Sequence, residues 1–438
     1  MVSHEQLNVR RVEAPGRVWP GYAMGLAAAL LLISARTTTP VLFGLLVIWA
    51  FLVRDQLRSL APPIDGVAAC LTAFLGYALL SSLWAASTLK GLSEGAIAAA
   101  IAATSLVLLQ LIQREDRTSL LRLGRGLTIG FAFGLAYFLL EVSSGQAIKI
   151  WLYNSLHLSA ALMEPDQNHR WAHGKLVAIS SATLSRNVAP MTPLLWPALM
   201  TVLGSWPGPK GRYAAGALLV FACLVIFVSP HETSKVAVVA AALIFSLATW
   251  RREWAYNAVK AAWIAACLCI VPMAVLAHKL DLQNAPWLQK SAQHRIVIWN
   301  FTARQVIKAP FFGSGIYTTY VRGPEISAKA ETKSGARFKE GMSRHAHNVF
   351  LQTWFELGLA GACLLLALGW AILRKFRDLS ASVQPFALAA FMSSMALMSS
   401  SYGMWQDWFL SLFALTPVLF AIGARVLDTA PDEADRAS

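Results

Sequence analysis

The residues best suited to proton transfer stand together at the start of a long apolar run. Beginning at Arg344, the chain reads RHAHNVFLQTWFELGLAG, so His345 and His347 directly precede a hydrophobic segment. An unperturbed imidazole titrates near neutral pH and can accept a proton from an attacking hydroxyl group. This placement favours His347 as a general base, with His345 orienting an acceptor or contacting a phosphate. Two interfacial imidazoles bonded only to backbone or lipid phosphate are the structural alternative.

The residues after His347 predict how its ring is positioned. Asn348 is a good helix N-cap, which would leave His347 at the rim of the helix with little freedom. Glu356 lies about 13 Å further along that helix. An acid at such a depth in a membrane is costly, so Glu356 is expected to hold an arginine or to fix the helix packing. In an extended segment, the alternating His345 and His347 would point to opposite sides.

Three arginines are candidates for binding a phosphate group. Residues 287–308 have helical periodicity and place Arg295 and Trp299 on one face. Arg186 stands before an apolar run, and Arg344 precedes the histidine pair. A guanidinium group suits a diphosphate because its planar fork makes bidentate, charge-assisted hydrogen bonds. We therefore expect a site for an anionic substrate, with Trp299 in support.

A metal site is a weaker prediction. His169 and His173 are four residues apart, the spacing of two metal ligands on one helical face. The sequence HRWAH lacks the glutamate of a zinc-protease motif, and no acidic or cysteine cluster lies nearby to complete a ligand shell. No metal ligand is therefore predicted.

The composition predicts the fold class. A chain of 438 residues with 56% hydrophobic residues, 14% charged residues and a mean hydropathy of +0.53 is too apolar for an ordinary soluble domain. A spanning helix needs about 20 mostly apolar residues. We predict an all-α polytopic integral membrane protein with about 12 transmembrane helices. The predicted spans are residues 20–34, 38–53, 66–83, 92–112, 124–142, 188–204, 212–229, 236–250, 257–277, 348–373, 384–400 and 403–424.

Basic residues in short loops predict the orientation, because such loops stay in the cytoplasm. The cytoplasmic set is Arg54, Arg58, Arg114, Arg117, Arg122, Arg125, Lys210, Arg212, Arg251, Arg252, Lys260, Arg374, Lys375 and Arg377, against Arg36, Lys90 and Lys235 in the short opposite loops. Both termini are then cytoplasmic.

Two long segments fall on the outer side in this topology. The predicted organisation is a membrane domain over residues 1–277 with an outer loop at 143–187, a large, partly helical loop over 278–347, and a second membrane domain over 348–438. The 278–347 loop has eleven Lys or Arg residues and four Asp or Glu residues. Such a surface concentrates anions, although a solvated basic face is the alternative. We expect membrane lipids as partners and no nucleic acid.

Several motifs resemble the O-antigen ligase and polymerase superfamily. They are His345-Ala-His347-Asn348-x-x-Leu351-Gln352 and Glu356-x-Gly358-x-x-Gly361, preceded by Arg295-x-x-x-Trp299 and Pro310-x-x-Gly313-x-Gly315. The resemblance covers the topology of the whole chain, whereas the specific motifs extend from about residue 295 to 361. Arg186 before a span is similar to a family arginine.

The resemblance implies a membrane glycosyltransferase of the C type whose donor is a glycan on undecaprenyl diphosphate. In a ligase, the acceptor is a hydroxyl group of lipid A-core on the periplasmic face of the bacterial inner membrane, in lipopolysaccharide biosynthesis. The resemblance also implies metal-independent transfer without a cofactor. His347 would be the base, His345 would assist, and Arg186, Arg295 and Arg344 would bind the diphosphate.

Three alternatives remain open at this point. An O-antigen polymerase and a protein O-oligosaccharyltransferase share the same motifs. The basic outer loop favours the ligase because lipid A and its core carry phosphates, and the short segment 425–438 disfavours the protein transferase. The alternative from another class is a transporter or flippase of an anionic lipid, which the nearly uncharged spans and the lack of an apparent inverted repeat disfavour.

Overall fold

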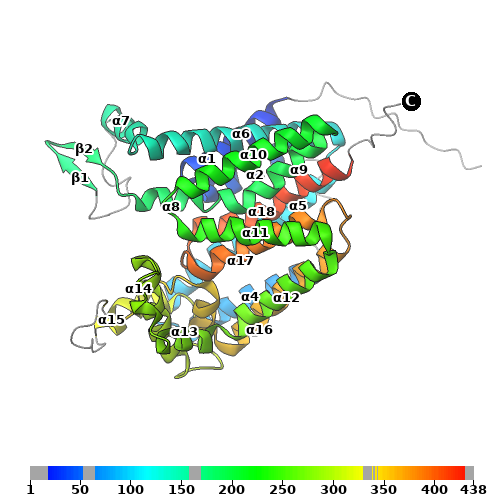
Figure 1. Cartoon of the computed structure of the whole chain (residues 1–438). Helices are drawn as coiled ribbons and strands as arrows, with labels where there is room; N and C mark the ends of the chain where they lie inside the picture. The colour runs from blue at the N-terminus through cyan, green and yellow to red at the C-terminus, as the bar shows by residue number, and fades with distance from the viewer. Residues whose placement is uncertain are drawn as a thin grey trace, which may run out of the picture.

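Long helices form the body of the molecule. The computed structural model describes residues 18–52, 65–156, 169–328, 338, 341–342 and 344–429. Figure 1 shows most of the long helices lying side by side in one bundle. These are α1 (Trp19–Ile33), α2 (Thr38–Leu52), α4 (Gly66–Leu80), α5 (Thr88–Arg114), α6 (Arg117–Ser143), α9 (Met191–Ser205), α10 (Pro209–Val228), α11 (Glu232–Trp250), α12 (Arg252–Leu268), α16 (Val349–Arg377), α17 (Gln384–Ser400) and α18 (Asp407–Asp428).

Shorter elements connect the long helices. They are η1 (Ala35–Thr37), η2 (Ser81–Trp84), α7 (Ala147–Ser155), α8 (Ala182–Val188), α13 (Ile270–Lys279), η4 (Leu282–Asn284), α14 (Lys290–Val306) and α15 (Thr318–Ala328). Strands β1 (Arg170–Ala172) and β2 (Lys175–Ala178) form an antiparallel hairpin that the sequence did not predict. Within the predicted outer loop 143–187, helix α7 ends at Ser155, and residues 157–168 lie outside the described part of the chain.

Every predicted span coincides with a helix, with α12 and α13 together corresponding to 257–277. Within the described residues, nine helices are long and apolar enough to cross a membrane, or ten if the bent α12–α13 pair is one span. The count extends α2, α4 and α9 by adjoining helical turns to Ala35–Leu52, Gly66–Trp84 and Thr183–Ser205. Helices α1 and α17, with 15 and 17 residues, are not in this count. The polytopic all-α class is confirmed, and the count of twelve spans stays a prediction.

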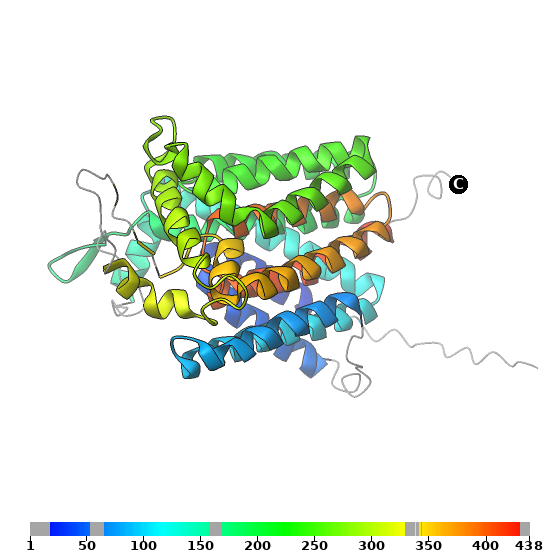
Figure 2. The same cartoon turned by 90° about the horizontal axis from the view of Figure 1, so that it is seen from below.

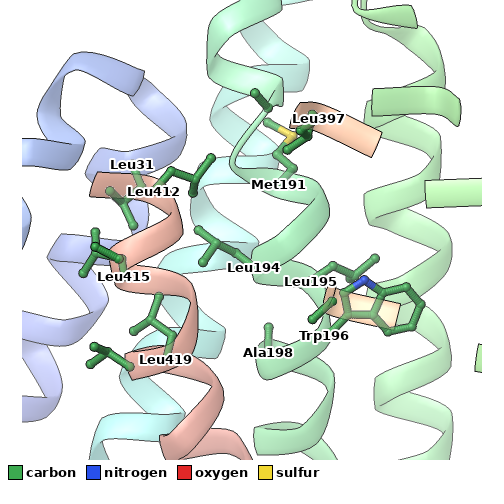
Figure 3. Close-up of a cluster of buried hydrophobic side chains, with 14 of the residues drawn as sticks. Leu31, Met191, Leu194, Leu195, Trp196, Ala198, Leu397, Leu412, Leu415 and Leu419 are labelled. Carbon is green, nitrogen blue, oxygen red and sulfur yellow. The ribbon is translucent and has the colours of Figure 1, made fainter. Parts of the chain in front are cut away.

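The core lies around α9, in which every residue from Met191 to Val202 is buried. Figure 3 shows Leu194 and Ala198 of this helix near Leu415 and Leu419 of α18. Trp196 is also buried, and its indole nitrogen donates to the Ser393 hydroxyl over 2.9 Å. A helix that is apolar all round needs partners on every side, so α9 takes the central place in the bundle.

Charged residues of the predicted cytoplasmic loops meet at one end of the bundle. Lys375 pairs with Asp65 over 2.9 Å, and Arg117 donates to the Thr429 carbonyl over 2.9 Å. Figures 1 and 2 both place the hairpin, α14 and α15 at the opposite end. Residues outside the described part include Arg54, Arg58, Lys329, Lys333, Arg337 and Lys339 of the predicted charge pattern.

A proline divides the predicted span 257–277. Pro272 has no amide hydrogen to donate to the Leu268 carbonyl, and its ring would clash with that carbonyl in a continuous helix. Helix α12 accordingly ends at Leu268, and α13 begins at Ile270 with a bend of 76°. Helix α13 then lies against α14 at the end of the bundle that carries the histidine motif.

Candidate functional site

An asparagine cap fixes the start of α16. The Asn348 Oδ1 accepts from the Leu351 amide over 2.9 Å, which confirms the predicted N-cap. Its Nδ2 donates to the Ser399 carbonyl at the end of α17 over 2.7 Å. Asn348 is only 1% exposed, so the residue that ends the histidine motif is fixed to two helices at once.

A break in the backbone interrupts α16 about three turns further on. Gly358 has φ 64° and ψ −161°, outside the helical region. The loop before α15 enters the break: the Leu359 amide donates to the Pro310 carbonyl over 2.8 Å, and the Gly315 amide donates to the Glu356 carbonyl over 2.8 Å. The glycine motifs at 313–315 and 358 therefore join the loop before α15 to α16.

Glu356 holds this junction together from a fully buried position. One carboxylate oxygen accepts from the Tyr317 amide over 2.9 Å, and the other accepts from the Thr319 amide over 3.0 Å. The Gln352 amide group and the Trp405 indole nitrogen complete its hydrogen bonds. These partners include no arginine within the described part of the chain, so the contacts favour the packing role of the two predicted for Glu356.

The two histidine rings face each other, so the prediction of opposite sides was wrong. Their ring centroids are 4.0 Å apart at an interplanar angle of 64°. The physical reason is that His347 has φ 54°, a left-handed conformation, and the segment is not extended. The Trp299 indole nitrogen donates to the Ala346 carbonyl between them over 3.0 Å, and the supporting role of Trp299 in the site stays a prediction.

The hydrogen bond made by His347 determines which nitrogen of its neutral ring carries the proton. Its Nδ1 lies 2.8 Å from the Ser401 carbonyl oxygen. A carbonyl can only accept, so Nδ1 carries the proton of the neutral ring and Nε2 keeps its lone pair. The loop that supplies this carbonyl is held in turn: the Met404 amide donates to the Gln352 Oε1 over 3.2 Å, and Trp405 donates to Glu356.

The surroundings keep both rings neutral. Burial lowers the pKa of His347 to about 4, an effect to which the positive charge of Arg295 contributes. Burial, the neighbouring His347 and Arg295 together lower the pKa of His345 to about 3. Arg295 lies on α14, one turn before Trp299, as predicted. Its guanidinium group makes no ion pair within the described residues, and its positive charge acts on two neutral imidazole rings.

The other two predicted arginines lie in different surroundings. Arg344 Nη1 donates to the Tyr320 hydroxyl over 3.2 Å, and the guanidinium carbon lies 5.3 Å from the Tyr320 ring centroid. Arg186 lies on α8, at the same end of the bundle in Figure 1. The cation whose charge acts on both histidines is Arg295, and the role of Arg186 stays a prediction.

Two further residues belong to this cluster but were missed in the sequence. His231 precedes α11 and stacks on Tyr402, with ring centroids 5.8 Å apart. Burial and the charge of Arg295 lower the pKa of His231 to about 3. Burial raises the pKa of Tyr402, and the charge of Arg295 offsets part of this rise. His231 stands alone before an apolar run, and only its place on the predicted outer side could have suggested a role.

The His169 and His173 pair does not share a helical face. His169 precedes β1, and its Nδ1 accepts from the Ser180 amide over 2.9 Å. His173 lies in the hairpin turn with φ 49°. Within the described ranges, no group of three His, Cys, Asp or Glu side chains could hold a metal ion. The metal independence implied by the resemblance stays a prediction.

The fold and the cluster define a polytopic membrane protein with neutral histidines and a cation at one end of its helices. Residues 217–366 match the sequence profile of the O-antigen ligase family. This range contains Arg295, both motif histidines and Glu356 but neither Arg186 nor the loop that carries Ser401.

Relatives in three Rickettsia species each carry the name "Putative polysaccharide ligase". The Rickettsia conorii protein is 30% identical over 28% of this chain and 30% of its own length. The Rickettsia prowazekii protein is 29% identical over 31% of this chain and 34% of its own length. The Rickettsia felis protein is 25% identical over 55% of this chain and 59% of its own length. The matches thus cover less than two thirds of these relatives. Together with the profile match, they make this chain similar to the O-antigen ligase-type family over the matched ranges.

Proposed function

We propose that the protein is an O-antigen ligase. It transfers a glycan from undecaprenyl diphosphate to a hydroxyl group of lipid A-core, in lipopolysaccharide biosynthesis. The observation that carries the proposal is the pairing of a neutral His347, with Nδ1 held by the Ser401 carbonyl, and the unneutralised Arg295. A base for the acceptor and a cation for the departing diphosphate are the two groups that this transfer needs.

The proposed reaction is a direct displacement at the anomeric carbon. The acceptor oxygen forms the new bond while the bond to the diphosphate oxygen breaks, which inverts the anomeric configuration. The acceptor proton passes to Nε2 of His347. The negative charge that develops on the diphosphate is stabilised by Arg295, with Arg186 and Arg344 as further cations. His345, packed beside His347, orients the acceptor.

The proposed location is the bacterial inner membrane, with the site facing the periplasm and both termini in the cytoplasm. The basic loops that meet at the opposite end of the bundle support this orientation. A donor anchored by a lipid must approach sideways from the bilayer, so a site at the end of the spans is reachable by its diphosphate.

The acceptor distinguishes this proposal from those for related enzymes. A polymerase would use another lipid-linked glycan, and a protein O-oligosaccharyltransferase would use a serine. We favour lipid A-core because its phosphates complement the outer cations, among which Lys279, Lys308 and Arg322 lie on the described surface. Replacing lipid A-core by a second lipid-linked glycan or a serine peptide in the same assay separates the three.

A transporter of an anionic lipid is the candidate from another class. The interruption of α16 and the bend between α12 and α13 favour it, because discontinuous spans are common in transporters. In α16, however, the backbone of residues 310–315 fills the break and satisfies its amides and carbonyls. A junction fixed by these hydrogen bonds favours a rigid site over the moving helices of a transporter.

The decisive experiment uses the purified protein with lipid-linked glycan and lipid A-core. Glycan transfer in excess chelator is the expected result. Activity lost to chelator and restored by a divalent ion would contradict metal independence. Movement of labelled glycolipid across a vesicle membrane, without transfer, would instead establish the transporter.

A further inference from the structure

The bend after α12 creates a surface that neither the histidine site nor the bundle core uses. Because α13 leaves α12 at 76°, it runs close to the membrane plane if α12 crosses the membrane. Its sequence, IVPMAVLAHK, is apolar until the last two residues. An apolar helix of 10 residues is too short to span a bilayer and suits a position at the membrane interface.

A groove lies between α13 and the end of α14. Its volume is about 390 Å³, and its walls are Val271, Pro272, Val275, Leu276, Lys279 and Ile307. Leu276 is 53% exposed and Ile307 is 66% exposed. Side chains this apolar are stable at such exposure when hydrocarbon, rather than water, covers them.

One end of the groove is cationic. Lys279 lines it, and Lys308 follows Ile307 directly; both are exposed. Neither ammonium group makes an ion pair within the described residues. Apolar walls with an unpaired lysine at the rim complement a molecule that has a hydrocarbon chain joined to an anionic headgroup.

We propose that this groove binds an acyl phospholipid with a net negative charge in the outer-side leaflet. The upper part of an acyl chain packs on Val275, Leu276 and Ile307, and the lipid phosphate pairs with Lys279. The site is separate from the histidine cluster, and the proposal does not depend on the catalytic function. It predicts selection for charge, which a merely apolar protein surface would not show.

Photo-crosslinking in lipid nanodiscs tests the proposal. The full-length protein is placed in a mixture of phosphatidylglycerol and phosphatidylcholine, and each lipid in turn carries a photoactivatable group on its acyl chain. We expect the phosphatidylglycerol probe to label peptides that contain residues 270–279 and 307 several-fold more than the phosphatidylcholine probe. Lys279→Gln should reduce the labelling by phosphatidylglycerol to the level of phosphatidylcholine.

Two variants make the result specific. Lys290→Gln removes an exposed lysine outside the groove and should leave the labelling unchanged. Leu276→Trp fills the groove and should reduce labelling by both probes. Equal labelling by the two lipids in the wild type would show ordinary bulk lipid and overturn the proposal. Unchanged labelling in Lys279→Gln, or crosslinks to a second copy of the chain in place of lipid, would overturn it as well.

Discussion

A histidine acts as a general base when one ring nitrogen is held and the other faces the substrate. His347 meets the first condition through Ser401, and its left-handed backbone turns the ring toward His345. A non-glycine residue in this conformation is strained and persists only where the surroundings enforce it. Here the Asn348 cap and the Trp299 bond to the Ala346 carbonyl enforce it from both sides.

Loss of the base should reduce turnover without abolishing donor binding. We expect His347→Ala to lower the transfer rate by ~10²–10⁴-fold, whereas His345→Ala should lose less because its role is to orient the acceptor. Initial rates and binding of labelled lipid-linked glycan measure the two effects separately. A fully active His347→Ala with an inactive His345→Ala would reverse the assignment of the base.

The acid limb of the rate profile should lie well below neutral pH. Burial and Arg295 lower the pKa of His347 to about 4 in the unliganded protein, so the ring remains neutral at pH 6. The value of kcat/KM, which reports the free enzyme, should stay level down to about pH 5 and fall toward pH 4. A bound diphosphate favours the charged ring, so kcat should fall at a higher pH. A kcat/KM midpoint near 6.5 would contradict this account.

Arg295 should contribute through both its charge and its shape. Arg295→Ala should lower transfer by one to two orders of magnitude, because a charge-assisted hydrogen bond is worth about 1.5–3 kcal/mol. Arg295→Lys keeps the charge but loses the planar fork, so an intermediate rate is expected. Arg186→Ala should show a comparable loss if it also binds the diphosphate. Wild-type turnover in well-inserted Arg295→Ala would remove this arginine from the site.

At the scale of elements, the hydrogen-bonded junction between α16 and the 310–315 loop helps to fix the positions of the histidines. Glu356 joins this loop to Trp405, which lies in the same turn as the Ser401 carbonyl. The chain of contacts therefore runs from the break in α16 to the ring of His347. A defect at the break should affect both folding and turnover.

Gly358→Ala provides the test at this scale. The combination of φ 64° and ψ −161° is one that essentially only glycine adopts, and an added Cβ would lie 2.4 Å from the Phe311 carbonyl oxygen. We expect a loss of at least about 1–3 kcal/mol in stability, with loss of transfer. Gly216→Ala in α10 is the matched control, because a Cβ there meets no atom within 4 Å. Equal apparent melting temperatures for the two variants would contradict the argument.

Periodicity predicted the elements better than their interruptions. The helix over 287–308 and the Asn348 cap depend on local patterns, and both were predicted. Pro272 indicated the bend at Cys269, but the continuous apolar run led to the prediction of one unbroken span over 257–277. The rotation of His347 and its bond to Ser401 depend on residues 54 positions apart, which no local pattern encodes. His231 and Tyr402 were missed for the same reason.

At the scale of the whole molecule, the end of the bundle that carries the histidine motif combines three partly or fully buried neutral histidines with an arginine that makes no ion pair within the described residues. His231, His345 and His347 come from different segments, yet all lie in the field of Arg295. Protonating any of them would add a second positive charge beside the first. The arrangement suits an anionic ligand, and protonation of the histidines at acidic pH destabilises it.

Stability should therefore fall in acid. The folded-state pKa values of these histidines lie at about 3 to 4, below the value of about 6.5 expected in the unfolded chain. As the pH falls from about 6.5 to 4, the unfolded state binds protons that the folded state does not, so stability falls through this window and not above it. His231→Gln should weaken this dependence, whereas His173→Gln, on the exposed hairpin turn, should leave it unchanged. Apparent melting temperatures of the purified protein between pH 4 and 8 measure the effect, and a donor-bound sample should resist acid better. A melting temperature that is level from pH 8 to 4, or an equal slope in His231→Gln, would show that these rings are not held neutral.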